Sequence, residues 1–146
     1  MRFLSNKERK VFNKKWNVKC KRVKEVQLKS CLVYECDDKV WVVKRNDVEF
    51  PFLEYVKEPY VVVDNGALPF ILKGADVMRP GIVELSEFNK DQIVAVKNMK
   101  GLTIAVGLAL FSSEEIKTME KGKVIKTLHY INDEVWRYAK HTQHNA

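Results

Sequence analysis

The second half of the chain is a series of short apolar segments, each separated from the next by residues that favour turns. The separators are Asp64-Asn65-Gly66 and the polar runs 88–91 and 98–101. Segments this short predict β-strands rather than helices, and several of them in succession favour a small barrel. The expected strands cover residues 60–63, 81–85, 92–97, 103–111, 123–128 and 134–138.

Two short helical segments are expected to interrupt this series. The first covers residues 73–78 and ends before Pro80, because a proline disfavours helix at the residue that precedes it. The second begins at Ser112, with Glu115 three residues later as in a capping box, and ends before Gly122. The second half is therefore expected to be rich in strands, with two short helices.

The N-terminus predicts a helix over residues 5–16. Ser5 and Glu8 have the spacing of a capping box, in which each side chain accepts a hydrogen bond from the other residue's backbone. Val11, Phe12 and Trp16 then recur at helical spacing, so we expect these three side chains to face inward.

Three apolar segments that follow this helix predict strands at 22–28, 31–36 and 40–45. The last two are joined at Asp37-Asp38, a pair typical of a tight hairpin. Together with the helix they make a small α+β unit.

A domain boundary is expected near Pro59. The apolar run 50–56 is followed by Lys57-Glu58-Pro59, where polar residues and a proline interrupt the pattern. The sequence therefore suggests a basic N-terminal domain at 1–58, a second domain at 59–138 and a flexible C-terminal tail at 139–146.

Positive charge is concentrated at the N-terminus. The whole chain has 26 Lys and Arg against 19 Asp and Glu, a net charge of +7, but residues 1–30 alone have 11 basic residues against two Glu, a net of +9. Lys7, Lys10 and Lys14 fall on the outer face of the expected helix, with Arg9 as a further candidate for that face. Phosphate backbones are the commonest partners of such patches, and the alternative is a solvated face that only keeps the protein soluble.

The three cysteines do not predict a disulfide or a zinc site. Cys20, Cys31 and Cys36 are odd in number, and their spacing fits neither a CxxC pair nor the framework of a secreted protein. Cys31 and Cys36 lie within or beside an apolar strand pattern. We therefore interpret them as small buried hydrophobic residues.

No recognised catalytic arrangement is present in the sequence. The chain has no Gly-rich phosphate loop, no GxGxxG, no HExxH and no GxSxG. His129 is expected to be structural, and His141 with His144 forms an H-x-x-H in a polar tail without a third ligand nearby. These observations predict a protein that is not an enzyme and has neither a metal nor a cofactor.

The sequence also indicates a cytoplasmic protein. No apolar run reaches the length of about 18 residues that a membrane-spanning helix needs. The N-terminus lacks the apolar core of a secretory signal.

A specific resemblance begins at residue 64. The run 64–82 reads Asp-Asn-Gly-Ala-Leu-Pro-Phe-Ile-Leu-Lys-Gly-Ala-Asp-Val-Met-Arg-Pro-Gly-Ile. It resembles the opening of a PUA domain (pseudouridine synthase and archaeosine transglycosylase), in which a strand, a short helix with Gly-Ala and a Pro-Gly-Ile turn precede the next strand. Later segments resemble the rest of that domain in the same order, so that the resemblance covers residues 60–136: they are 91–94, 105–107, 121–124, 129–130 and 133–136.

Within PUA proteins, the chain is similar to the malignant T-cell-amplified sequence family and its archaeal members. The segment 112–115, the pair 129–130 and Trp136 carry this resemblance in the second half, and the segments 4–8 and 50–53 resemble the archaeal type in the first half. The resemblance implies an α+β fold. A small N-terminal α/β pre-PUA domain precedes a PUA pseudo-barrel of mainly antiparallel strands with two short helices.

The resemblance implies RNA binding in the translation apparatus, because PUA domains hold structured RNA against the short helix and the strands beside it. The partner would be tRNA or small-subunit rRNA on the small ribosomal subunit, and the protein would assist initiation or recycling. The expected RNA-binding residues are Lys73, Gly74, Ala75, Met78, Arg79, Pro80, Gly81, Lys10 and Lys14.

The residue types of this expected site agree with RNA binding in part. Gly74 and Ala75 would let a phosphate or ribose approach the backbone, while Lys73 and Arg79 bracket them with positive charge. Simple turn geometry is an alternative explanation for the glycines. Met78 has an alternative as a core residue, because methionine next to Val77 in a short helix is often buried.

Three other functions stay open at this stage. The chain could be an accessory factor in tRNA or rRNA modification or in ribosome biogenesis. It could also be an adaptor that joins an initiation factor through the basic helix, or an enzyme that acts on modified nucleosides. The oligomeric state is left open.

Overall fold

The computed structural model describes the main chain of residues 1–144 and the side chains of residues 1–142. The chain forms two compact units. The first combines Met1–Phe52 with the C-terminal segment that begins at Glu134, and the second is Leu53–Asp133. The C-terminal segment therefore belongs with the N-terminal half of the chain, and the division falls after Phe52 rather than near Pro59.

The first unit is built on a five-stranded antiparallel sheet whose strands neighbour one another in chain order. The strands are β1 (Arg2–Phe3), β2 (Val23–Gln27), β3 (Leu32–Cys36), β4 (Lys39–Arg45) and β5 (Val48–Pro51). Of these, β2, β3 and β4 confirm the three expected strands. Asp37 and Asp38 have the φ angles of 47° and 74° that a tight hairpin requires.

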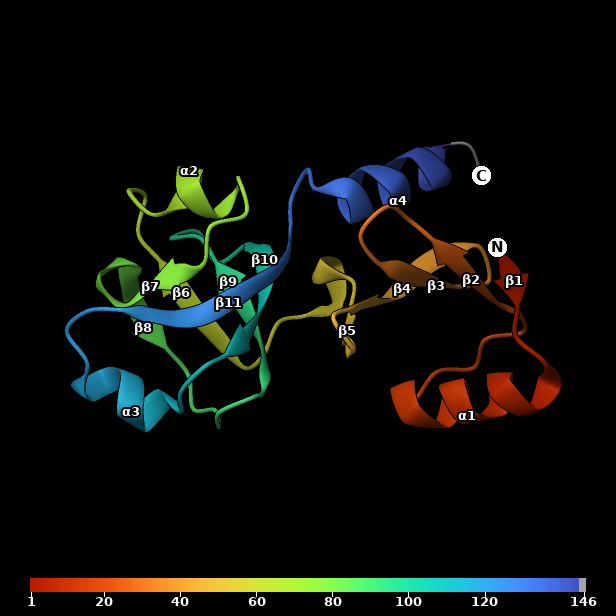
Figure 1. Ribbon diagram of the computed structural model, residues 1–146, viewed down its shortest axis with the longest axis horizontal. Coiled ribbons are helices and arrows are strands. Elements are labelled where there is room, and N and C mark those ends of the chain that lie inside the picture. Colours follow the sequence, from red (N-terminus) through yellow and green to blue (C-terminus); the bar gives the residue numbers. More distant parts are fainter. Residues whose placement is uncertain (145–146) are drawn as a thin grey trace. The chain divides into compact units, whose positions relative to one another are not determined.

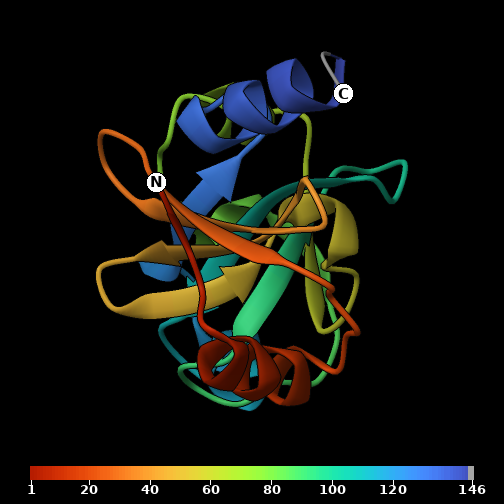
Figure 2. The ribbon, with the colours of Figure 1, turned by 90° about the vertical axis from the view of Figure 1, so that its right-hand side faces the viewer.

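Helix α1 (Asn6–Trp16) confirms the expected N-terminal helix. Both capping-box hydrogen bonds are present: the Glu8 backbone N–H donates to Ser5 Oγ at 3.1 Å, and the Ser5 N–H donates to Glu8 Oε1 at 2.9 Å. α1 lies on one face of the first sheet, and α4 (Glu134–His144) lies on the other (Figures 1 and 2).

The buried face of α1 differs from the expected one at one position. Phe12 is buried, but Val11 is 63% exposed. Arg9 and Asn13 turn toward the segment after the helix, where both donate to the backbone carbonyl of Cys20. Because residues advance by about 100° around a helix, Val11 falls nearly opposite the face shared by Phe12, Arg9 and Asn13.

The C-terminal segment is a helix, so the expected strand at 134–138 is wrong. Val135 and Ala139 are fully buried four residues apart, which is helical and not strand periodicity. The expected flexible tail at 139–146 is likewise helical up to His144, because the helix packs against the first sheet and buries Ala139 there. Residues 145–146 lie outside the described part of the chain.

A disulfide joins Cys20 to Cys36, contrary to the sequence interpretation. Val23 and Cys36 are directly opposed between β2 and β3, and the chain just before β2 brings Cys20 within a Cα–Cα distance of 5.3 Å. Spacing along the chain did not reveal this pairing, because it depends on the register of two strands. Cys31 is buried, as expected, and lies outside the disulfide.

The second unit contains a six-stranded sheet in the order β7-β11-β10-β9-β6-β8. Neighbours are antiparallel except β6 and β9, which are parallel. Its strands are β6 (Tyr60–Val63), β7 (Val77–Met78), β8 (Ile82–Leu85), β9 (Ile93–Lys97), β10 (Thr103–Ala109) and β11 (Lys123–Tyr130). β7 and β8 are the two ends of the sheet but follow each other in the chain through the 3₁₀ turn η2 (Arg79–Gly81), so the sheet curls into a nearly closed barrel.

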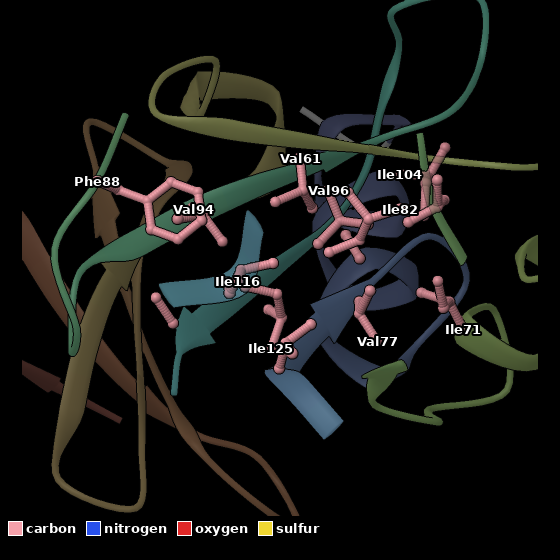
Figure 3. Close-up of a cluster of buried hydrophobic side chains, with 14 residues drawn as sticks. Val61, Ile71, Val77, Ile82, Phe88, Val94, Val96, Ile104, Ile116 and Ile125 are labelled. Carbon is pink, nitrogen blue, oxygen red and sulfur yellow. The ribbon is translucent and has the colours of Figure 1, made fainter. Parts of the chain in front are cut away.

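The core of the second unit fills the inside of this barrel (Figure 3). Val96 of β9 and Ile125 of β11 are fully buried there. Helix α2 (Leu68–Ile71) contributes Ile71, and helix α3 (Ser113–Thr118) contributes Ile116. The expected capping box of α3 is present, with the Glu115 N–H donating to Ser112 Oγ at 3.2 Å. The two short helices thus cover the barrel core.

The first of these helices lies earlier in the chain than expected. The segment 73–78 is not helical: α2 ends at Ile71, and β7 has formed by Val77. Pro69 lies in the first turn of α2, where a missing N–H costs nothing. Gly74 lies within the expected helix and has a φ of +98°, which a helical backbone does not adopt.

The helices of this protein are short. Within the described main chain the longest, α1 and α4, have 11 residues each. A bilayer requires about 20 predominantly apolar residues in one helix. Among the residues described, no helix has the length and apolar character to cross a membrane.

A buried carboxylate connects α4 to the first sheet and generates a testable prediction. Glu35 of β3 is 1% exposed, accepts a hydrogen bond from the Tyr138 hydroxyl and lies 3.6 Å from Lys24 Nζ. Tyr138→Phe removes that donor from a buried acceptor. We expect the unfolding free energy at neutral pH to fall by about 1–2 kcal/mol.

The same contact predicts a pH dependence. Burial and the hydrogen bond to Glu35 raise the pKa of Tyr138 from 10.0 to about 12. The stabilisation is therefore complete below pH 10.0 and is lost as the pH rises toward about 12. Urea denaturation of the parent protein and of Tyr138→Phe across this pH range will measure the difference in unfolding free energy. In a Glu35→Gln background Tyr138→Phe should cost less, and equal costs in both backgrounds would contradict this assignment.

Candidate nucleic-acid interface

A pocket of about 690 Å³ opens on the second unit. Its walls come from the turn after β6, helix α2, the segment 74–76 and the β7–η2 connection. These are the parts of the barrel where its two edge strands meet. The pocket therefore lies at the point where the sheet closes.

Asp64 ties two of these walls together. Its backbone N–H donates to the Gly81 carbonyl at 2.8 Å, which joins the end of β6 to η2. Its Oδ1 accepts from the Ala67 N–H at 2.8 Å, which fixes the turn leading into α2. One residue thereby positions both the helix and the turn on either side of the pocket.

The third wall, the segment 74–76, is held on β11 by Thr127. Thr127 Oγ1 donates to the Ala75 carbonyl at 2.9 Å, and the Thr127 N–H donates to Asp76 Oδ1 at 2.9 Å. Gly74 begins this segment with its positive φ, and a Cβ there would lie 3.3 Å from Tyr130 Oη. Backbone and side chain thus meet closely behind the pocket.

Gly81 is required by close packing. A Cβ at Gly81 would lie 2.9 Å from Ala67 Cβ, so η2 and the start of α2 approach each other only because both residues are small. The turn-geometry explanation agrees with the positive φ of Gly74, whereas Gly81 is explained by its packing against Ala67. Neither explanation competes with a binding role, because both glycines also line the pocket.

Two large apolar side chains stand at the pocket and are open to solvent. Phe70 of α2 is 66% exposed, and Met78 of β7 is 48% exposed. The alternative of Met78 as a core residue is therefore wrong. Exposed aromatic and thioether groups beside a cavity form a surface on which a flat ring can stack.

The charges in the pocket lining are mainly acidic. Asp64, Asp76 and Lys123 are the charged residues of the lining, with a net charge of −1. Lys123 Nζ lies 3.0 Å from Asp76 Oδ2, so these two neutralise each other. The Oδ2 atom of Asp64 has no hydrogen-bond partner among the residues described. A phosphate is a poor fit for this interior, whereas an uncharged hydrogen-bond donor is a good one.

The pocket brings together five of the residues expected from the sequence. Gly74, Ala75, Met78, Pro80 and Gly81 all line it. Lys73 is exposed next to Gly74 but is not part of the lining.

Arg79 has a structural position instead. Its Nε donates to the Ile116 carbonyl in α3 at 2.7 Å, and its Nη1 donates to the Ile82 carbonyl at 3.4 Å. The Arg79 N–H also donates to the Gly122 carbonyl at 2.8 Å. Its guanidinium therefore fastens η2 to α3 and does not enter the pocket lining.

Lys10 and Lys14 belong to the other compact unit. Both are exposed on α1 together with Lys7, as the outer-face prediction requires. Arg9, which sequence reasoning placed near the same face, turns inward to the Cys20 carbonyl at 3.1 Å.

Sequence reasoning missed seven residues of the lining: Asp64, Gly66, Ala67, Phe70, Ile71, Asp76 and Lys123. Asp64 opens the very run that carried the resemblance, so its position was a usable signal. Phe70 gave no such signal, because an apolar residue in a short helix is expected to be buried. Asp76 and Lys123 become neighbours only through the pairing of β7 with β11.

His129 is structural, in line with its prediction. It is fully buried, and its Nδ1 lies 2.8 Å from Asp133 Oδ2, which also accepts from the Tyr130 N–H at 2.9 Å. Among the residues with described side chains, no group of three or more His, Cys, Asp or Glu residues is arranged to hold a metal ion.

Comparison with known proteins places this fold and pocket in context. A family model for the PUA domain matches residues 59–131. An uncharacterized protein of Methanocaldococcus jannaschii is 39% identical over 102 residues, which is 65% of this chain and 63% of that protein. Translation machinery-associated protein 20 of Eremothecium gossypii is 30% identical over 132 residues, or 79% of this chain and 73% of that protein.

A malignant T-cell-amplified sequence 1 homolog of Drosophila melanogaster is 37% identical over 110 residues, covering 68% of this chain and 60% of that protein. The alignment thus spans less than two thirds of the length of the Methanocaldococcus and Drosophila relatives.

Two solved structures are also informative. A conserved PUA domain protein from Thermoplasma acidophilum has a TM-score of 0.74 and 29% identity, over 94% of this chain and 97% of that one. A chain of an H/ACA ribonucleoprotein bound to a substrate RNA has a TM-score of 0.52 and 25% identity, over 62% of this chain and 29% of that one. The chain therefore belongs to the family of PUA-domain proteins that includes the malignant T-cell-amplified sequence proteins and translation machinery-associated protein 20.

Proposed function

We propose that this protein is a non-enzymatic RNA-binding factor of translation that acts in the cytoplasm and holds an unpaired nucleotide in its pocket. The carrying observation is the contrast between an apolar, slightly acidic pocket and the exposed lysines outside it. A nucleotide has the same division, with a flat uncharged base at one end and a charged phosphate at the other.

The base is the part that fits inside the pocket. Single-stranded RNA is recognised by stacking of unpaired bases and by hydrogen bonds to their edges. Phe70 and Met78 offer the stacking surface, and the partner-free Oδ2 of Asp64 can accept from a base amino group or a ribose hydroxyl. Only the donor requirement of Asp64 distinguishes between ligands, since stacking tolerates every base.

The phosphates fit outside the pocket. Lys73 is exposed directly before Gly74, and Lys121 is exposed directly before the turn that leads into β11. Both adjoin the pocket lining in the chain, at Gly74 and at Lys123. Contacts of this kind position RNA without reading its sequence.

Relatives support a role in translation. Translation machinery-associated protein 20 is named for that association, and the resemblance to a chain of an RNA-bound ribonucleoprotein supports RNA as the ligand. We infer that the RNA is tRNA or small-subunit rRNA, that the small ribosomal subunit is the particle bound, and that initiation or recycling is the step assisted.

The exposed lysines of α1 provide a second contact in this proposal. Lys10 and Lys14 make no ion pair within the described residues, so their charge is available to a phosphate backbone. Two weak contacts with one RNA bind far more tightly than either does alone. An adaptor that joins an initiation factor through α1 is the competing function, and salt dependence separates the two.

The first prediction concerns the pocket wall. Met78→Ala should weaken binding to tRNA or to small ribosomal subunits about tenfold, because it removes part of the surface on which the base stacks. Met99→Ala is the matched control, since Met99 is 57% exposed but outside the lining. Fluorescence polarisation with tRNA, subunits and duplex DNA will measure the affinities. Equal losses in both variants would contradict the pocket assignment, and equal binding of RNA and DNA would favour the adaptor.

The second prediction concerns the phosphate contact of Lys73. Lys73→Gln should make the plot of log affinity against log salt shallower by about 0.7, the value for one phosphate contact on a single strand. Lys100→Gln is the control, because Lys100 is also exposed, lies on the β9–β10 turn and is outside the pocket lining. An unchanged slope in Lys73→Gln would remove this residue from the interface.

The third prediction separates Arg79 from the RNA contacts. Arg79→Met should lower the unfolding free energy by about 1–3 kcal/mol, because the Ile116 and Ile82 carbonyls lose their donor. The affinity of the folded protein for tRNA should stay within about twofold of the parent value, because the Arg79 side chain is not part of the pocket lining. A loss of affinity with unchanged stability would instead assign Arg79 to the interface.

A further inference from the structure

The Cys20–Cys36 disulfide lies in the middle of a basic segment that no other part of the proposed function uses. Residues 17–22 connect α1 to β2 without regular structure, and Lys19, Lys21 and Arg22 are exposed on either side of buried Cys20. We call residues 17–22 the connecting segment. Its net charge is +3, in a stretch of the chain that holds a structural crosslink.

Cys20 is the point where this segment is fastened to α1. Asn13 of α1 binds both backbone groups of Cys20: its Oδ1 accepts from the N–H at 3.1 Å, and its Nδ2 donates to the carbonyl at 3.1 Å. Arg9 Nη1 donates to the same carbonyl at 3.1 Å. The position of Cys20 therefore sets the position of the connecting segment relative to the helix.

The other side of the segment is fastened to the end of β3. The disulfide joins Cys20 to Cys36, and Asp37 Oδ1 accepts from the backbone N–H groups of Lys21 at 3.0 Å and Arg22 at 2.9 Å. Of these links, the disulfide is the covalent one. The disulfide thus supplies the covalent link in a set of contacts that joins helix, segment and sheet.

The contacts of Cys20 and Asp37 fix the main chain that carries a set of cationic side chains. The row Lys10–Lys14 lies one residue, or about 100°, around α1 from the row Arg9–Asn13 that grips the segment. Within the described residues Lys10, Lys14 and Lys19 make no ion pair, unlike Lys15, which pairs with Glu49 at 3.2 Å, and Arg22, which pairs with Asp38 at 3.6 Å. Lysines on a fixed main chain suit a phosphodiester backbone, because binding does not have to order the main chain that carries them.

The disulfide is also open to exchange. Cys20 is 1% exposed, whereas Cys36 is half-buried at the end of β3, so Cys36 is the more accessible of the two residues and the point at which exchange would begin. Attack by a dithiol at Cys36 Sγ breaks the S–S bond, forms a mixed disulfide and releases Cys20 as a thiolate. The second thiol of the reagent then displaces Cys36. The dithiol is oxidised by two electrons, and both cysteines end as thiols after taking up its two protons.

The neighbouring cations favour this reaction. Lys19 and Lys21 flank Cys20 in the chain, and nearby positive charge stabilises the thiolate that leaves. A low-molecular-weight disulfide reverses the reaction by the same exchange.

We propose that the Cys20–Cys36 disulfide is a redox-controlled clamp for a polyanion-binding surface formed by Lys10, Lys14 and the connecting segment. Oxidation holds the cations in register, and reduction releases the segment so that the surface loses affinity. The identity of the polyanion as RNA rests on the proposed function, but the clamp itself does not.

The test compares the full chain after treatment with oxidised glutathione and with dithiothreitol. Thiol titration should count one thiol in the first state and three in the second, because Cys31 lies outside the disulfide. On reduction, hydrogen exchange at the amides of α1 and of Cys20 to Arg22 should accelerate about tenfold or more, as a crosslink of this loop size contributes that much local stability. Amides of β9 and β10 in the second unit should not change.

The binding arm uses inorganic polyphosphate and an oligouridylate as separate probes. Reduced protein should bind both about threefold to tenfold more weakly and with a shallower salt dependence. The Cys20→Ser/Cys36→Ser variant should resemble the reduced state under either treatment, while Cys31→Ser should keep the full redox response. Because polyphosphate has no base, failure of the RNA pocket would affect oligouridylate alone, whereas failure of the clamp would remove the redox response with both probes, so the two are distinguishable.

Three results would overturn the proposal. Three thiols after oxidation would mean that the clamp does not form, and unchanged exchange in α1 after reduction would mean that it does not hold the helix. Faster exchange with unchanged polyphosphate affinity would mean that the clamped surface is not a polyanion site.

Discussion

Closure of the second sheet is the constraint on which the candidate site depends. The strands β7 and β8 are the two ends of the sheet, yet only the three residues of η2 separate them in the chain. So short a connection leaves room only for small residues where it meets α2, which is why Gly81 lies against Ala67. Arg79 anchors this turn to α3, and the pocket is the space that remains beside it. The connection that closes the barrel thus also forms the pocket.

The distribution of charge separates two kinds of contact in this protein. Positive charge is concentrated in the first 30 residues, whereas the pocket of the second unit has a net charge of −1. A pocket with that balance suits a base, and exposed lysines suit phosphates, so the proposed RNA ligand would account for both features. The first unit keeps its cations in place through α1, Cys20 and the end of β3. The basic surface of the first unit is therefore held by specific contacts, as the pocket of the second unit is.

Features that depend on neighbours in the chain were predictable. The capping boxes at Ser5 and Ser112 and the hairpin at Asp37-Asp38 are local, and each formed as expected. Features that depend on contact partners were not. Val135 and Ala139 became helical because they pack on a sheet from the other end of the chain, which overrides a weak strand pattern. The disulfide was not predictable for the same reason: strand register rather than spacing along the chain brings Cys20 to Cys36.

The sequence alone determined the PUA-type run of motifs, the two-part organisation and the basic N-terminus, because composition and local patterns carry that information. It also identified five residues of the pocket, since they lie in one continuous run from Gly74 to Gly81. Only the tertiary structure decided that Arg79 turns to α3 while Asp64, Phe70 and Lys123 join the lining. The physical reason is that a side chain's direction depends on the elements packed around it, and strand pairing assembles those from distant parts of the chain.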